Sequence, residues 1–169
     1  STMSFLKFFK FLLFLICANQ AASYEVTCKY AVISWAYLPD HYQCQAIELE
    51  VTRFSELLDS IKGNHLSGKS NSDVKSVYIS GQTCHYIPQG FTHGRFFPNL
   101  EALQIHNSKL KSIWQNDFTE YKNLKSLYLS GNHLTQLDSQ VFKYMPKLLR
   151  LELQENHLRR IHEDIFDEL

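Results

Sequence analysis

A 24-residue repeat is the feature that most limits how this chain can fold. Leu100, Leu124 and Leu148 open three successive units, and each unit carries apolar residues at the same offsets from its first leucine. A degenerate copy begins at Val74 and is followed by a 26-residue step to Leu100. One unit is too small to bury these side chains alone, so the repeat predicts units stacked into a solenoid with a continuous core. The repeated positions of the middle unit are Leu124, Leu127, Leu129, Asn132, Leu134, Leu137, Phe142 and Met145.

Each unit divides into a strand, a turn and a return path. The alternation of Leu127 and Leu129 predicts a short strand with its apolar side chains turned inward. Asn132 and Asn156 follow at the turn, where their side-chain amides can satisfy backbone groups that the turn leaves unpaired. Leu134 and the later apolar residues then fill the layer behind the strand.

The pattern L-x-x-L-x-L-x-x-N-x-L over residues 74–169 resembles the leucine-rich repeat family, in the 24-residue form typical of extracellular members. The resemblance implies an α/β-type repeat solenoid, a horseshoe of about four units with short parallel strands on its concave face. Segments 63–74 and 83–88 are similar to short secreted repeat proteins of insects. Because Leu169 is the twenty-second position of its unit, we interpret the chain as an N-terminal fragment whose last unit is truncated.

Residues 24–73 lack the repeat and are interpreted as a capping region that covers the first unit. The alternating segment 47–51 predicts an edge strand beside the solenoid. Apolar residues at i, i+3, i+4 and i+7 between Phe54 and Ile61 predict a short amphipathic helix that ends at Gly63.

Residues 1–23 have the pattern of a secretory signal peptide. Lys7 and Lys10 precede the apolar run 11–18, and small and polar residues follow it, with cleavage expected after Ala22 or Ser23. The alternative, an N-terminal anchor or core helix, is disfavoured because the run is too short to span a membrane. Ser1 and Thr2 precede a plausible initiator methionine and are interpreted as leader or scar. We therefore expect a secreted protein or the ectodomain of a cell-surface protein.

The cysteines fit an oxidising compartment. Once the signal segment is removed, Cys28, Cys44 and Cys84 remain. Cys28 and Cys44 are the natural disulfide pair because both lie in the non-repeating N-terminal region. Cys84 occupies a repeat position that leucine holds in the later units, which predicts a buried thiol acting as a small hydrophobe. A disulfide between Cys84 and the N-terminal region is the alternative.

The charge balance argues against nucleic acid as a partner, and the hydropathy argues against a membrane span. The chain has 17 basic and 17 acidic residues, whereas sequence-independent binding of nucleic acid needs a surplus of lysine and arginine. No stretch reaches 18 uninterrupted apolar residues, so we expect no membrane span within this chain.

One segment matches a nucleotide-binding motif. Residues 63–70, GNHLSGKS, fit G-x-x-x-x-G-K-S, the loop that holds phosphate in nucleotide hydrolases. That loop needs a strand before it and a helix after it, whereas here a helical pattern precedes Gly63 and a strand follows at Val74. We interpret the segment as an ordinary loop, and a nucleotide-binding enzyme that uses Lys69 is the alternative hypothesis.

The remaining chemistry-bearing residues give no specific site. His133 and His157 lie 24 residues apart at the same repeat position and could share a cation, but a zinc site would need two more ligands. No nucleophile–histidine–carboxylate grouping can be assembled with any specificity. We expect neither a cofactor nor enzymatic activity.

The resemblance places binding on the concave face. There, the strand residues between the inward leucines point outward and can contact a protein partner, whose identity the sequence does not give. Tyr78 and Tyr128 are amphipathic rings of the kind that anchor interfaces, and Arg150 with Glu152 adds a charged end. The candidate partner-binding residues are Tyr78, Ser80, Gln104, His106, Tyr128, Ser130, Arg150, Glu152 and Gln154.

Overall fold

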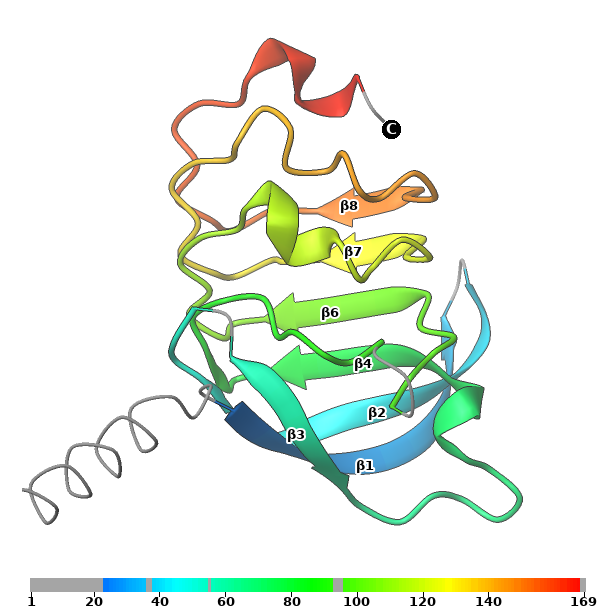
Figure 1. Cartoon of the computed structure of the whole chain (residues 1–169). Coiled ribbons are helices and arrows are strands. Elements are labelled where there is room, and N and C mark those ends of the chain that lie inside the picture. Colours follow the sequence, from blue (N-terminus) through cyan, green and yellow to red (C-terminus); the bar gives the residue numbers. More distant parts are fainter. Residues whose placement is uncertain (1–22, 36–37, 55, 93–95, 168–169) are drawn as a thin grey trace, which may run out of the picture.

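One continuous sheet organises the protein. The computed structural model describes residues 23–35, 38–54, 56–92 and 96–167. The sheet runs in the order β3-β1-β2-β4-β6-β7-β8 (Figure 1). The short strand β5 pairs with β2 outside this order. The strands are β1 (Ser23–Trp35), β2 (Leu38–Val51), β3 (Leu57–Lys62), β4 (Val74–Ser80), β5 (Thr83–Cys84), β6 (Ala102–His106), β7 (Ser126–Tyr128) and β8 (Arg150–Glu152).

Strands β4, β6, β7 and β8 stack in parallel, one for each repeat unit. Leu103 is the register partner of Leu127, and Leu127 is the partner of Leu151, so neighbouring units are aligned at a spacing of 24 residues. Leu103, Leu127 and Leu129 are fully buried, as are Val77 and Ile79 in β4. The predicted stack of units around one core is therefore confirmed.

The expected α/β character is wrong in its helical part. Within the described residues, the helices are short 3₁₀ helices: η1 (Asn71–Asp73) directly before the first repeat strand, and η2 (Gln115–Phe118) and η3 (Glu163–Phe166) on the return paths. A 24-residue unit leaves few residues for the path back to the next strand. Asp117 accepts a hydrogen bond from the backbone N–H of Trp114 (2.8 Å), which caps the start of η2 within this short path. The short path therefore holds tight turns and 3₁₀ helices instead of an α-helix.

The two repeat asparagines lie at the turns after the strands. Asn132 is 1% exposed, and its Oδ1 accepts hydrogen bonds from the backbone N–H groups of Ser108 and Leu110, both at 3.1 Å. Its Nδ2 donates to three carbonyl oxygens, including that of Leu129 at 2.9 Å. Nδ2 of Asn156 likewise donates to three backbone carbonyl oxygens, and its Oδ1 accepts a hydrogen bond from the N–H of Leu134. These amides tie each turn to the preceding unit.

The N-terminal region extends the sheet of the repeats. β1 and β2 form a long antiparallel hairpin, and β2 pairs in parallel with β4. The predicted disulfide between Cys28 and Cys44 is confirmed, and it joins the two arms of this hairpin. Cys84 is a free, buried thiol whose pKa is raised by burial.

Two local predictions for this region are wrong. Segment 47–51 belongs to β2, which lies between β1 and β4 and is not an edge. The segment expected to be helical up to Ile61 contains strand β3, which pairs in parallel with β1 and forms the edge of the sheet. A short apolar pattern does not distinguish a helix from a strand, and the open edge of β1 supplies the backbone partners that favour the strand.

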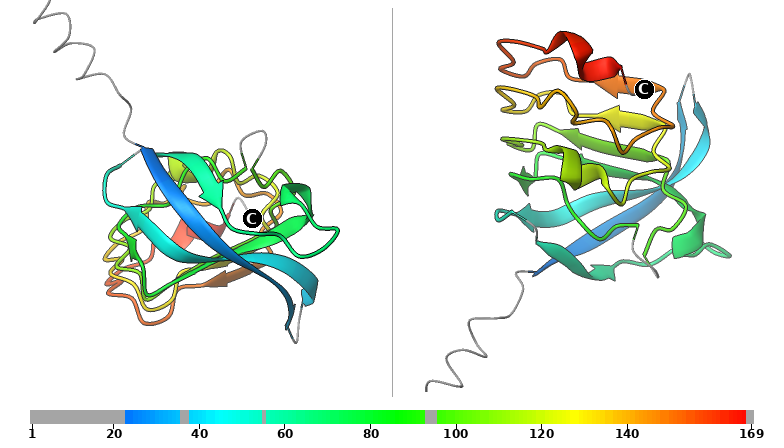
Figure 2. Two further views of the ribbon diagram at one scale, coloured as in Figure 1. Left: turned by 90° about the horizontal axis from the view of Figure 1, so that it is seen from below. Right: turned by 45° about the horizontal axis from the view of Figure 1, so that its top comes forward.

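The far end of the hairpin leaves the plane of the repeats. In Figures 1 and 2 it rises beside β6 and β7, near the ends where these strands begin. The predicted signal segment falls almost wholly in residues 1–22, outside the described residues. Among the described residues, no helix combines the length and hydrophobicity needed to cross a membrane.

Candidate functional site

The candidate site is the side of the parallel sheet that points away from the repeat core, here called the sheet face. Its exposure is uneven. Gln104 and Tyr128 are each only 2% exposed, and Ser76 and Ser126 are also buried. Gln154 is exposed, and the other predicted partner-binding residues are partly exposed: Tyr78, Ser80, His106, Ser130, Arg150 and Glu152.

Three rings form a column across the middle of the sheet face. The ring of His106 lies 5.7 Å from that of Tyr78 and 6.2 Å from that of Tyr128, measured between centroids. Nδ1 of His106 is hydrogen-bonded to Oγ of Ser130 at 2.7 Å. Burial lowers the pKa of His106, and the nearby carboxylate of Glu152 opposes this effect. The column is therefore a fixed aromatic surface whose histidine favours the neutral form.

A buried polar network closes the sheet face beside the hairpin. Nε2 of Gln104 donates to Oγ of Ser76 (2.9 Å) and to Oε1 of Gln43 (3.2 Å), and Ser76 also donates to Gln43. Because Gln104 is used in this network and is buried, it is placed to join β2 to the repeats. As the chain is folded here, Gln104 has almost no surface to offer a partner.

A row of charges lies where the strands begin. Glu101 accepts hydrogen bonds from Lys75 at 3.1 Å and from Lys125 at 2.7 Å. Burial alone would raise the pKa of Glu101, but these two lysines hold it below its ordinary value. His41 of β2 is 6% exposed, and burial lowers its pKa, with smaller influences from the same three charged groups. The hairpin is thus packed close to this row.

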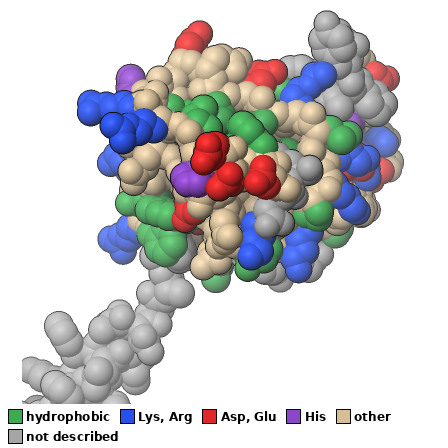
Figure 3. Space-filling model, turned by 90° about the horizontal axis from the view of Figure 1, so that it is seen from above, with side chains coloured by type: hydrophobic (Ala, Val, Ile, Leu, Met, Phe, Trp, Pro, Cys, Tyr) green, Lys and Arg blue, Asp and Glu red, His purple; other side chains and the backbone are tan. Residues whose placement is uncertain are grey.

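The other end of the sheet face is open and charged. Glu152 accepts a hydrogen bond from Nε2 of Gln154 at 3.1 Å, and Arg150 lies on the same strand. Leu149, next to Arg150, is 85% exposed. Figure 3 views this end of the molecule and shows hydrophobic side chains among basic and acidic ones.

The GNHLSGKS segment does not have the surroundings of a phosphate loop. A strand, β3, precedes it, and the three-residue η1 and then β4 follow it. Nζ of Lys69 pairs with Asp73 at 3.5 Å and lies 5.7 Å from the ring centroid of Tyr42. His65, inside the segment, stacks on Tyr30 with the ring centroids 4.0 Å apart. The loop is packed onto the hairpin, and its lysine is already paired.

The histidines of successive units do meet. The rings of His133 and His157 are stacked with their centroids 5.7 Å apart. Within the described residues, no three histidine, cysteine or acidic side chains are grouped so as to hold a metal ion. The two rings form a stacked pair of loop histidines.

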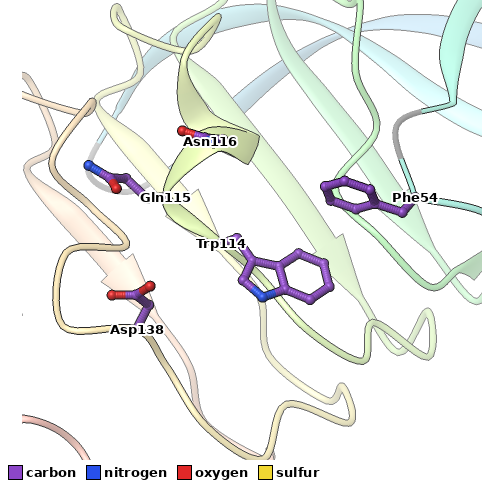
Figure 4. Close-up of a pocket in the computed structure, with 5 residues that line it drawn as sticks. All are labelled: Phe54, Trp114, Gln115, Asn116 and Asp138. Carbon is purple, nitrogen blue, oxygen red and sulfur yellow. The ribbon is translucent and has the colours of Figure 1, made fainter.

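Sequence reasoning missed an aromatic cluster on the return paths. Trp114 lies 5.1 Å from Phe54 and 6.0 Å from Tyr86, measured between ring centroids, and Phe54 and Trp114 are 56% and 40% exposed. Trp114 and Phe54 border a pocket of about 430 Å³ (Figure 4). A signal was present, because the repeat position of Trp114 holds proline, aspartate or histidine in the other units and so needs no apolar side chain.

Comparison with known families supports the repeat assignment. The family model described as "Leucine rich repeat" matches residues 72–134 and again residues 122–169. Together the two matches cover more than half of the chain. No curated protein matches the sequence significantly.

Proposed function

Because this chain belongs to the leucine-rich repeat family, we propose that it is a secreted recognition module that binds a protein partner through the open part of its sheet face. Leucine-rich repeat domains generally mediate protein–protein interaction, and they are typically not enzymes. Solenoids of this kind use an extended concave surface for binding. The open part is the set of sheet-face residues with exposed area: Tyr78, Ser80, His106, Ser130, Arg150, Glu152 and Gln154.

The observation that carries the proposal is the ring column on the sheet face. Tyr78 and His106 come from neighbouring units and contact each other, so neither ring loses much conformational freedom when a partner binds. Aromatic anchors on a rigid surface are the residues that most often dominate a protein interface. Gln104 and Tyr128 lie in register with Tyr78 on the same face but are buried, so we expect the partner contacts to fall on their exposed neighbours.

Secretion is part of the proposal. The Cys28–Cys44 disulfide and the repeat fold fit an extracellular domain. The basic and apolar pattern of residues 1–23 supports export. Both a soluble binder and a receptor ectodomain agree with these features, and the balanced charge of the chain favours a protein partner over nucleic acid.

No observation favours the alternative of a nucleotide-binding enzyme. Lys69, the lysine that would hold phosphate, is paired with Asp73 and lies near the ring of Tyr42. The segment that follows the loop is also too short to supply the N-terminus of a phosphate-binding helix.

A comparative capture experiment tests the proposal. The oxidised chain is immobilised and exposed to the extracellular proteins of its source organism, and the captured proteins are quantified by mass spectrometry. A double variant of the sheet face, Tyr78→Ala with Arg150→Glu, should lose the specific partner. The control Lys122→Ala with Lys143→Glu changes exposed side chains on the return paths and should keep it. Equal capture by both variants would contradict binding through the sheet face.

A further inference from the structure

The pocket beside Trp114 lies away from the sheet strands. Its lining comes from three connections: the one after β2, the one after β6 and the one after β7 (Figure 4). Its volume of about 430 Å³ is within the range of pockets that bind small molecules. The lining residues, here called the aromatic pocket, are Phe54, Trp114, Gln115, Asn116 and Asp138.

The aromatic part of the pocket is held in place from several sides. Phe54 meets Trp114 edge to face, with an angle of 85° between the ring planes, whereas Tyr86 stacks on Trp114 at 19°. The backbone of Trp114 is fixed by the hydrogen bond from its N–H to Asp117. The indole therefore offers a rigid, partly exposed plane, and binding a flat apolar surface there costs little ordering.

The polar part of the pocket has hydrogen-bonding groups that can still bind a ligand. Among the described residues, no hydrogen bond engages the side-chain amide of Gln115 or of Asn116, and each amide offers two donor hydrogens and an acceptor oxygen. Asp138 uses Oδ1 to accept from the backbone N–H of Gln140 at 3.0 Å, which leaves Oδ2 for a ligand. A ligand here can thus combine an apolar face with several hydroxyl groups.

A second hollow continues the first. It has a volume of about 310 Å³ and shares Trp114 and Asp138 with the aromatic pocket. Its further lining residues include Ser112 and Gln136, which add a hydroxyl and another amide. Both hollows are bordered by the same indole, and this arrangement suits a ligand made of linked, similar units.

We propose that this groove binds a linear, uncharged oligosaccharide of hexopyranose units with equatorial hydroxyl groups. Such a sugar ring presents axial C–H groups on its flat faces, which carry slight positive charge and stack on the negative face of an indole. Its hydroxyl groups lie around the rim, where the amides of Gln115 and Asn116 and the carboxylate of Asp138 can bond them.

Charge and polarity separate this ligand class from others. The lining of the aromatic pocket contains one charged side chain, Asp138, and it is acidic, which disfavours sulfated or phosphorylated sugars. A wholly apolar ligand would cover the amides of Gln115 and Asn116 without bonding them, and this is costly. A neutral sugar satisfies both parts of the pocket.

Titration with defined oligosaccharides tests the proposal. The secreted, oxidised full chain carries Trp35→Phe, so that Trp114 is its one remaining tryptophan and reports on the pocket by fluorescence. The probes are cellohexaose, laminarihexaose and chitohexaose, each followed by fluorescence and by calorimetry. At least one of these oligosaccharides should bind. Trp114→Ala, made in the wild-type background and measured by calorimetry, should weaken this binding by about tenfold or more, which is 1.4 kcal/mol. Asp138→Ala should also weaken it.

Controls separate a binding role from a structural one. Trp114→Phe keeps an aromatic ring against Phe54 and should fold normally by circular dichroism while binding more weakly. Tyr78→Ala lies on the sheet face and should leave sugar binding unchanged, so this result is independent of the proposed protein partner. Heparin hexasaccharide and a proline-rich decapeptide serve as competing ligand classes. The proposal is overturned if no neutral hexaose binds at millimolar concentration, if binding survives Trp114→Ala, or if only heparin or the peptide binds.

Discussion

Replacing Asn132 by alanine tests how the repeat turns are held together. The substitution removes an amide that is 1% exposed and leaves the N–H groups of Ser108 and Leu110 without their side-chain acceptor. A buried donor left unpaired costs about 1–3 kcal/mol, and water can recover part of this if the new cavity admits it. We therefore expect the free energy of unfolding to fall by about 3 kcal/mol, measured by urea denaturation of the oxidised chain and followed by circular dichroism.

Asn156→Ala is the matched control for this experiment. Asn156 has the same place in its unit, but it is only partly buried and its Oδ1 accepts from one backbone N–H, that of Leu134. Its loss should cost about 1–2 kcal/mol because one donor, rather than two, loses its partner. If Asn132→Ala costs less than Asn156→Ala, or changes stability by under about 0.5 kcal/mol, the hydrogen-bond argument is refuted.

Two further predictions concern Asp117 and the disulfide. Burial raises the pKa of Asp117 to about 6, so the folded state holds its proton more tightly than the unfolded state, and the stabilisation present below pH 4 is lost as the pH rises to 6. Asp117→Asn keeps an oxygen for the N–H of Trp114 and removes the buried charge, so it should raise the free energy of unfolding by roughly 2 kcal/mol at pH 7.5 but change it little at pH 4. Urea denaturation at the two pH values measures this difference, and equal effects at both would contradict the reasoning. The Cys28–Cys44 disulfide spans a sequence separation of 16 residues, so replacing both cysteines with alanine should cost about 3 kcal/mol through loss of the loop constraint. Reducing agent should lower the unfolding midpoint of the wild-type chain but not that of the double variant, and a wild-type midpoint insensitive to reduction would show that the disulfide does not stabilise the fold.

Much of the fold could be predicted because the repeat makes its contacts periodic. Leu103, Leu127 and Leu151 stand at one offset in successive units, and stacking places them side by side in the core. The position of Cys84 followed from the same rule, since a repeat position that holds leucine elsewhere requires an apolar side chain. In such regions each unit contacts its neighbours, so sequence spacing determines spatial proximity.

The N-terminal region does not obey this rule. Segment 57–62 has apolar residues at helical spacing, but it becomes strand β3 because β1 offers an open edge. The same β1–β2 hairpin packs against the first repeats and closes part of the sheet face. Gln104 was expected to contact a partner, but it bonds Gln43 of β2 instead. These outcomes depend on pairing between segments that share no periodicity.

The sequence by itself determined the stacked units, the inward leucines and the turn positions of Asn132 and Asn156, and it favoured the pairing of Cys28 with Cys44. Only the tertiary structure decided which sheet-face residues stay exposed and which side chains meet in the aromatic pocket. Trp114 and Asp138 hold the same position in neighbouring units, so the repeat brings these two together, whereas Phe54 comes from the connection after β2 and no spacing rule places it beside them. The physical reason is that nearest-neighbour contacts in a repeat are encoded locally, whereas contacts between a hairpin, a loop and successive units arise only when the whole chain packs.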